Sequence, residues 1–278
     1  MRIDAHQHFW IYNNREYDWI DDSMAAIRRD FLPQHIAPEL AANKFDGSVL
    51  VQTRQTLEET RWLLELADQH SSILGVVGWA DLRSPDIRSQ LKSLTRNPKL
   101  VGLRHIVQGE PDDRFLLQPD FLRGMSAVED VGLAYDILIY TKHLPVAAEF
   151  VKRFPRQRFV LDHMAKPPIR TGEINAWADR IRSLAIYPNV FCKLSGLVTE
   201  ADWHHWKPEQ ITPYLDVVFD AFGPGRLMIG SDWPVCLVAA SYMQVIQLVK
   251  SYIVRLPAED RDAILGENAA RFWRLKSR

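Results

Sequence analysis

Strand-like segments recur eight times along the 278-residue chain, and stretches with helical periodicity separate them. Each segment is a short apolar run bounded by turn residues, which is the pattern of a buried strand. The intervening stretches, such as 56–70 and 144–155, place apolar residues three and four apart and so predict amphipathic helices that cover a sheet. The eight predicted strands are 2–9, 45–52, 73–81, 100–107, 133–140, 158–165, 190–196 and 226–234.

This alternation constrains the fold class more than any other feature. Eight strand–helix units in a chain of this length predict a parallel (β/α)8 TIM barrel in the α/β class, rather than an open doubly wound sheet. The chain also lacks the GxGxxG and GxxxxGK[ST] phosphate motifs. Segment 262–275 reads as a closing helix that Gly266, Glu267 and Asn268 interrupt. No internal repeat or Gly/Ser linker divides the chain, so we expect residues 1–278 to form a single domain.

Composition limits the classes of partner. Hydrophobic residues make up 47% of the chain and charged residues 25%, which suits a globular protein with a large core. The net charge of −1 provides no basic field for nucleic acid or an anionic membrane. The sequence has neither a secretory signal pattern nor an apolar run of about 18 residues. We therefore expect a cytoplasmic protein with a small-molecule partner, in which Cys192 and Cys236 are buried, reduced thiols. The oligomeric state stays open.

Polar residues gather at the carboxyl ends of the predicted strands, where a barrel of this kind carries its chemistry. In the first strand, the alternation of side chains puts Asp4, His6 and His8 on one face. Five other strands contribute polar groups near their ends, namely Arg104, His105, Asp136, Tyr140, His163, Lys166, Lys193, Ser195 and Asp232. Each of these residues alone has a structural explanation as a hydrogen-bonded core group. Their common placement predicts an active site.

Three strand ends also carry motifs that resemble a known family. DAHQHFW from residue 4, LDHMAKP from residue 161 and IGSDWPV from residue 229 resemble the amidohydrolase superfamily, in particular its amidohydrolase-2 branch. That branch contains sugar lactonases such as fuconolactonase and rhamnonolactonase. The resemblance covers nearly the whole chain, through GENAARFW from residue 266, and HxH combined with SDWP is specific. It implies that His6, His8, His163 and Asp232 surround a hydrolytic water.

The resemblance also bears on a metal. His6, His8 and Asp232 supply three nitrogen and oxygen ligands and leave a position for water, which is adequate for zinc. Binuclear members of the superfamily add a carboxylated lysine on strand four and a histidine on strand five. This chain has Arg104 with His105 on strand four and Asp136 on strand five, which disfavours a two-metal site. One divalent metal, or none as in some members of the branch, is the expectation.

The predicted reaction is the opening of a sugar (aldono-) lactone to its acid, as in L-fucose degradation. We expect Asp232 to remove a proton from a water among the three histidines, and the water to attack the lactone carbonyl. Asp232 then returns the proton to the departing ring hydroxyl. Arg104 or His105 is expected to stabilise the oxyanion, and strand alternation lets only one of the two point into the mouth. Arg104 is preferred.

Further residues are predicted to bind the sugar. The predicted loops are rich in tryptophan, and Trp233, beside Asp232, is the strongest candidate to pack on a sugar ring. Lys166 and Tyr140 are expected to contact the substrate. Asp136 is expected either to hold a substrate hydroxyl or to orient Arg104 by a charge-assisted pair.

Other functions compete with the lactonase prediction. A zinc-dependent decarboxylase of an aromatic carboxylic acid shares the scaffold, and Asp4 before the HxH motif is compatible with it. A hydrolase of amides or phosphoesters is disfavoured by the missing strand-four lysine. A non-catalytic binding barrel belongs to a different class, and it predicts that replacing Asp232 changes stability only.

Overall fold

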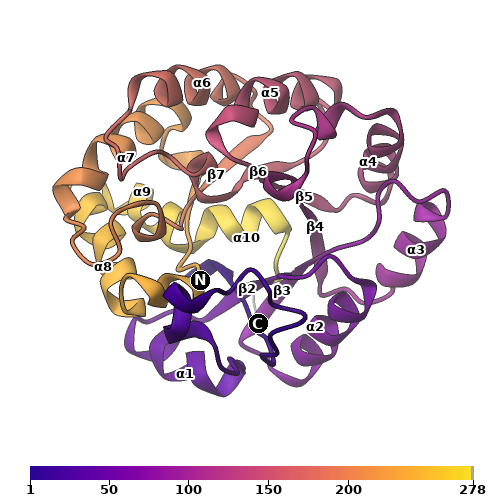
Figure 1. The fold of residues 1–278 in the computed structure, drawn as a ribbon, viewed down its shortest axis with the longest axis horizontal. Helices are drawn as coiled ribbons and strands as arrows, with labels where there is room; N and C mark the ends of the chain where they lie inside the picture. The colour runs from indigo at the N-terminus through magenta and orange to yellow at the C-terminus, as the bar shows by residue number, and fades with distance from the viewer. Residues whose placement is uncertain (277–278) are drawn as a thin grey trace.

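The computed structural model describes residues 1–276, and all eight predicted strands are confirmed. They pair in parallel and in sequence order around one sheet (Figure 1). The strands are β1 (Ile3–Gln7), β2 (Gly47–Val51), β3 (Ile73–Gly78), β4 (Leu100–Ile106), β5 (Ala134–Leu138), β6 (Phe159–Leu161), β7 (Val190–Leu194) and β8 (Leu227–Ile229). The fold is therefore a (β/α)8 barrel.

Helices form a ring outside the strands. The predicted helices at 56–70 and 144–155 are confirmed as α2 and α5, and the Thr56 hydroxyl begins α2 by accepting a hydrogen bond from the Glu59 backbone N–H. No helix described within residues 1–276 is long and apolar enough to cross a membrane. The helices are α1 (Pro33–Ala42), α2 (Leu57–Gln69), α3 (Ile87–Leu94), α4 (Pro119–Val131), α5 (Leu144–Arg153), α6 (Asn175–Ala185), α7 (Pro208–Phe222), α8 (Tyr242–Ile253), α9 (Ala258–Asp262) and α10 (Asn268–Trp273).

The barrel closes where β8 meets β1. The Asp232 backbone N–H donates to the His6 carbonyl at 2.8 Å, and the His8 N–H donates to the Trp233 carbonyl at 2.7 Å. These two hydrogen bonds lie beyond the end of β8, which stops at Ile229. The seam of the barrel therefore sets the distance between the HxH histidines and Asp232.

Helix α10 closes the end of the barrel at which the strands begin, and it lies across the middle of the ring in Figure 1. Phe272 and Trp273 pack against inward residues such as Val49 and Val160 and form a small second core inside the barrel. The predicted interruption at Gly266 is confirmed, because a helical turn of different geometry precedes α10 there. A Cβ atom on Gly266 would overlap the Met1 carbonyl oxygen, so glycine lets this turn approach the N-terminus.

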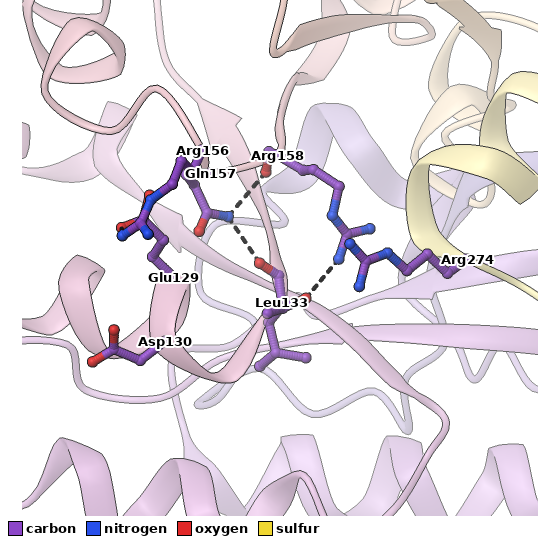
Figure 2. Close-up of a pocket in the computed structure, with 8 residues that line it drawn as sticks. Glu129, Asp130, Leu133, Arg156, Gln157, Arg158 and Arg274 are labelled. Atoms are coloured by element: carbon purple, nitrogen blue, oxygen red, sulfur yellow. Dashed lines mark hydrogen bonds and ion pairs between the residues drawn. The ribbon is translucent and has the colours of Figure 1, made fainter.

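A shallow cavity of about 330 Å³ lies at this closed end. Figure 2 shows the guanidinium of Arg158 beside that of Arg274, and Arg156 beside Glu129. Arg158 donates to the backbone carbonyls of Gly132 and Phe272 and so ties the entry to β5 to helix α10. Burial, with a smaller contribution from Arg274, lowers the pKa of Arg158 to about 10. Surface ion pairs and hydrogen bonds from Arg158 to backbone carbonyls therefore stabilise this end of the barrel.

Candidate active site

The carboxyl ends of the strands surround a cavity of about 510 Å³. His8, His163, Asp232 and Arg104 line its floor, and aromatic side chains stand in its wall. The wall residues include Trp19, Met24, Tyr140, Lys166, Glu200 and Trp203. The strand ends predicted to meet at one mouth therefore do so.

The floor is a tight cluster of three imidazoles and one carboxylate. Asp232 Oδ1 lies 3.3 Å from His8 Nε2, 3.7 Å from His6 Nε2 and 3.8 Å from His163 Nε2. The Nε2 atoms of His6 and His8 are 3.1 Å apart. All four side chains are buried, with at most 6% of any one exposed. The Nε2 atoms of the three rings therefore gather around one buried carboxylate oxygen.

An unusual backbone turn presents His163 to this cluster. Strand β6 ends at Leu161, and residues 163–166 all have φ between 51° and 57°, which is left-handed. Such residues cost roughly 1–2 kcal/mol each, so neighbouring contacts must hold the turn. Trp177 donates to the Met164 carbonyl at 2.9 Å, and Thr141 donates to the Lys166 carbonyl at 3.1 Å.

Gly196 leaves room for the His163 ring. This glycine has φ of 61°, and a Cβ on it would lie 2.7 Å from His163 Nδ1. The preceding residue, Ser195, has its hydroxyl 2.9 Å from the same nitrogen. The loop after β7 therefore fixes the ring by one hydrogen bond and by the absence of a side chain.

Burial and mutual contact set the protonation of the cluster. Burial lowers the pKa of His6 well below its ordinary value and lowers that of His163 to about 4, so both rings are neutral at neutral pH. Burial raises the pKa of Asp232, but contact with His163, His8 and His6 outweighs it and holds this pKa below the usual range. Asp232 is thus ionised at neutral pH.

A layer of paired charges lies beneath the cluster. Lys193 Nζ lies 2.5 Å from Asp136 Oδ2, 2.9 Å from Asp162 Oδ1 and 3.0 Å from His6 Nδ1. Arg104 donates to Asp162 Oδ2 at 3.0 Å and to the Gln52 carbonyl. Lys193 and both aspartates are fully buried. This layer supports His6 from below. Its two cations, Lys193 and Arg104, match its two carboxyl groups, Asp136 and Asp162, in number.

The two aspartates of this layer differ. Burial raises the pKa of Asp136 to about 7 despite Lys193. Burial also acts to raise the pKa of Asp162, but Lys193, His6 and Arg104 outweigh it and keep this pKa well below the ordinary value. Asp162 is thus the firmly ionised member of the pair.

The cluster has the donor set and spacing for one metal ion. His6, His8 and Asp232 each offer one ligand atom within 4.8 Å of the others. Tetrahedral zinc with bonds of about 2.0–2.1 Å needs ligand atoms roughly 3.3 Å apart, close to the separations in the cluster. His8 Nδ1 lies 2.7 Å from the Val51 carbonyl and donates to it, which leaves the lone pair of the neutral ring on Nε2. The residues fit a single zinc.

Three residues predicted to bind substrate lie outside the cavity lining. His105 faces away from the mouth, with Nε2 2.6 Å from Glu110 and its ring stacked on Phe115, because strand alternation points Arg104 inward. Asp136 is sealed beneath the floor by Lys193. Trp233 is 3% exposed and packs edge-on against Phe31, with ring centroids 5.0 Å apart. The cavity lining therefore includes Arg104 but none of these three side chains.

Asp4 also lies away from the cavity. Its carboxylate accepts hydrogen bonds from the Ser231 backbone N–H at 2.9 Å and from the Tyr242 hydroxyl at 3.0 Å. Burial raises its pKa to about 6. Asp4 thus ties β1 to the loop after β8 and to helix α8. The two cysteines are buried free thiols, as predicted.

Sequence analysis missed Asp162 and Glu200. Asp162 stands beside His163 in LDHMAKP, and its signal was a carboxylate next to a candidate histidine at the end of β6. Glu200 lies six residues beyond β7, in a loop whose path no local pattern predicts. Burial raises the pKa of Glu200, and Lys166 opposes this shift.

Comparison with known proteins decides the family. The sequence profile described as Amidohydrolase matches residues 3–275. The chain belongs to the amidohydrolase family. This amidohydrolase is 42% identical over 286 residues to an L-fucono-1,5-lactonase of Burkholderia multivorans, covering 99% of this chain and 96% of that protein. It is 41% identical over 281 residues to an L-fucono-1,5-lactonase of Burkholderia ambifaria, with the same coverage.

A solved structure extends the likeness to the fold. A crystal structure of an amidohydrolase from Burkholderia multivorans with bound zinc superposes with a TM-score of 0.96 at 42% identity. The match covers 99% of this chain and 100% of that one. The family resemblance seen in the strand-end motifs and the barrel predicted from the strand–helix alternation are therefore confirmed.

Proposed function

We propose that this amidohydrolase opens a sugar lactone to the corresponding sugar acid, with an L-fucono-1,5-lactone-like substrate in sugar catabolism. The full-length identity to two L-fucono-1,5-lactonases supports the substrate class. The observation that carries the proposal is the ionised Asp232 carboxylate among three buried imidazoles at the floor of the cavity. A carboxylate so placed can take a proton from a water and return it within one turnover.

The residues divide the reaction between them. Asp232 accepts the proton of a water that His8, His6 and His163 hold at the cavity floor, and the water oxygen attacks the lactone carbonyl carbon. Arg104, whose Nη1 lies 3.4 Å from His6 Nε2, brings a positive charge to the oxygen that becomes negative. When the ring C–O bond breaks, Asp232 gives the proton to the departing hydroxyl.

A zinc ion in this site would be held by His6, His8 and Asp232 and would supply Lewis-acid polarisation of the water and the carbonyl. Lys193 and Asp162 hold the His6 ring from behind, with the ammonium 3.0 Å and the carboxylate 3.5 Å from Nδ1. The backbone carbonyl of Val51 does the same for His8.

The rival functions receive no comparable support from the site. Asp4, the residue that makes a decarboxylase attractive, is used in holding the barrel seam and does not line the cavity. A non-catalytic barrel leaves unexplained why the buried carboxylate of Asp232 faces open space beside three rings.

The test is acid release from a panel of aldonolactones, including L-fucono-1,5-lactone, followed with a pH indicator. Purified protein is assayed before and after chelation, with metal analysis of both samples. We expect rapid acid release from at least one lactone. Release that survives chelation assigns proton transfer to Asp232 and the imidazoles alone, and release restored by zinc assigns His6, His8 and Asp232 as ligands. No release from any lactone, with acid consumption on an aromatic acid instead, contradicts the proposal.

A further inference from the structure

Two charged side chains in the cavity wall have no part in water activation. Lys166 ends the left-handed turn after β6, and Glu200 ends the short helical segment Val198–Glu200 after β7. Lys166 Nζ lies 3.5 Å from Glu200 Oε1, and each side chain is 21% exposed. Both residues line the same cavity as Asp232 and His163.

The pair is only partly satisfied by its own members. A charge-assisted hydrogen bond between an ammonium and a carboxylate is usually about 2.7–2.9 Å long, so 3.5 Å is loose. Among residues 1–276, Lys166 is the one ion-pair partner of the Glu200 carboxylate, and the Lys166 ammonium otherwise faces the Tyr140 ring, 5.5 Å from its centroid. A lysine has three donors and a carboxylate about four acceptor sites. Donors and acceptors therefore remain open side by side.

The backbone around both residues is fixed. The Thr141 hydroxyl donates to the Lys166 carbonyl at 3.1 Å, and the Arg170 N–H donates to the Glu200 carbonyl at 3.0 Å. The Trp203 indole donates to the Thr199 carbonyl at 2.9 Å, which sets the angle of that ring in the same wall. The site is thus preorganised, with the Tyr140 ring beside the Lys166 ammonium and Trp203 in the same cavity wall.

We propose that Lys166 and Glu200 form a subsite for two neighbouring hydroxyls of the lactone. One hydroxyl donates to the Glu200 carboxylate, and the adjacent one accepts from the Lys166 ammonium. This inference rests on the proposed function and deepens it, because it makes the pair the element that selects a polyhydroxylated lactone. A lactone without hydroxyls would leave both charges desolvated and unpaired by substrate, which is strongly disfavoured.

Steady-state kinetics on two substrates tests the subsite. The quantity compared is kcat/KM for an aldonolactone divided by kcat/KM for unsubstituted δ-valerolactone. In Glu200→Gln we expect this ratio to fall roughly tenfold to a hundredfold, mainly through KM, because a hydrogen bond to a charged group is lost. Lys166→Met is expected to lower the ratio as well, and the double variant to fall by less than the product of the two single effects.

Glu129→Gln is the control variant, since Glu129 also forms an ion pair, in its case with Arg156, but at the opposite end of the barrel. We expect it to leave the ratio unchanged. A ratio in Glu200→Gln equal to that of the unmodified protein, with an unaltered melting temperature, overturns the subsite and leaves lactone hydrolysis standing. An unmodified protein that hydrolyses neither lactone overturns the proposed function, and the subsite falls with it.

Discussion

The barrel has a cavity lined by charged residues at each end: the closed end, at the amino ends of the strands, and the active-site end, at their carboxyl ends. The two ends differ in how their charged side chains are paired and exposed. At the amino end, Arg156 pairs with the Glu129 carboxylate at 3.0 Å, with 81% of the Arg156 side chain exposed to water (Figure 2). At the carboxyl end, Lys193 is fully buried between Asp136 and Asp162. Water screens the first pair, whereas the second has to be matched by protein groups alone.

This difference shows where a ligand can be acted on. At the amino end, Arg158 donates hydrogen bonds to the backbone carbonyls of Gly132 and Phe272. These contacts stabilise the fold and use the guanidinium as a structural group. At the carboxyl end, the buried layer holds His6 in place, and Asp232, His8 and His163 face the cavity. Paired charges support the site, and the groups that face the cavity are those we propose to carry out the reaction.

The largest expected effect concerns activity at the carboxyl end. Asp232→Asn keeps the side-chain shape but removes the proton acceptor, so we expect kcat to fall by roughly 10²–10⁴-fold with the fold unchanged by circular dichroism. Glu129→Gln at the amino end should retain normal turnover. Turnover near normal in Asp232→Asn would contradict the mechanism.

The next effect concerns stability. Lys193→Met removes the one cation between two buried carboxylates, and we expect unfolding free energy in urea to drop by about 3–5 kcal/mol. Arg156→Met breaks an ion pair at the amino end and should lower the unfolding free energy by only about 0–1 kcal/mol. Equal losses in the two variants would remove the distinction between the ends.

A pH series sharpens the comparison. His163 has a pKa of about 4 in the folded protein against an ordinary value of 6.5, so the unfolded chain binds the proton more readily. This group therefore contributes stability that is fully present above pH 6.5 and is lost as the pH falls toward 4, roughly 3 kcal/mol in total. We expect metal-free protein to show this loss in urea unfolding and His163→Gln to show a shallower pH dependence. An identical dependence in both proteins would exclude His163 as its source.

The smallest effect is expected at the amino end. Arg274→Gln removes the positive neighbour of Arg158, and we expect a stabilisation within about 0.5 kcal/mol and unchanged lactone hydrolysis. Thermal unfolding and the acid-release assay measure the two quantities. A clear loss of activity would show that the amino end of the barrel is coupled to the active site and would contradict this prediction.

Much of the fold and part of the site could be predicted from local sequence. The eight strands and helices α2 and α5 follow from apolar periodicity, which is a property of neighbouring residues. His6, His8, His163 and Asp232 were predicted together because each stands at a strand end in a recognisable motif, and the structure brings them together.

The predicted substrate-binding residues that lie outside the cavity lining are displaced for a common physical reason. His105 and Trp233 stand near strand ends like the true cavity residues, but their side chains leave the barrel mouth. Asp136 does point inward, one level below the cavity floor, where Lys193 from β7 covers it. Strand position was predictable, but depth and direction depend on how neighbouring strands are staggered.

By itself, the sequence determined the alternation of strands and helices and the residue types at each strand end, because both are written in contiguous stretches. Only the tertiary structure decided which of those residues share the cavity. The buried partners of Lys193 and the pairing of Lys166 with Glu200 each join segments from different strands, and Thr141 and Trp177 hold the left-handed turn at 163–166 from outside it. Contacts of that kind depend on barrel closure and register, which no short stretch of the chain encodes.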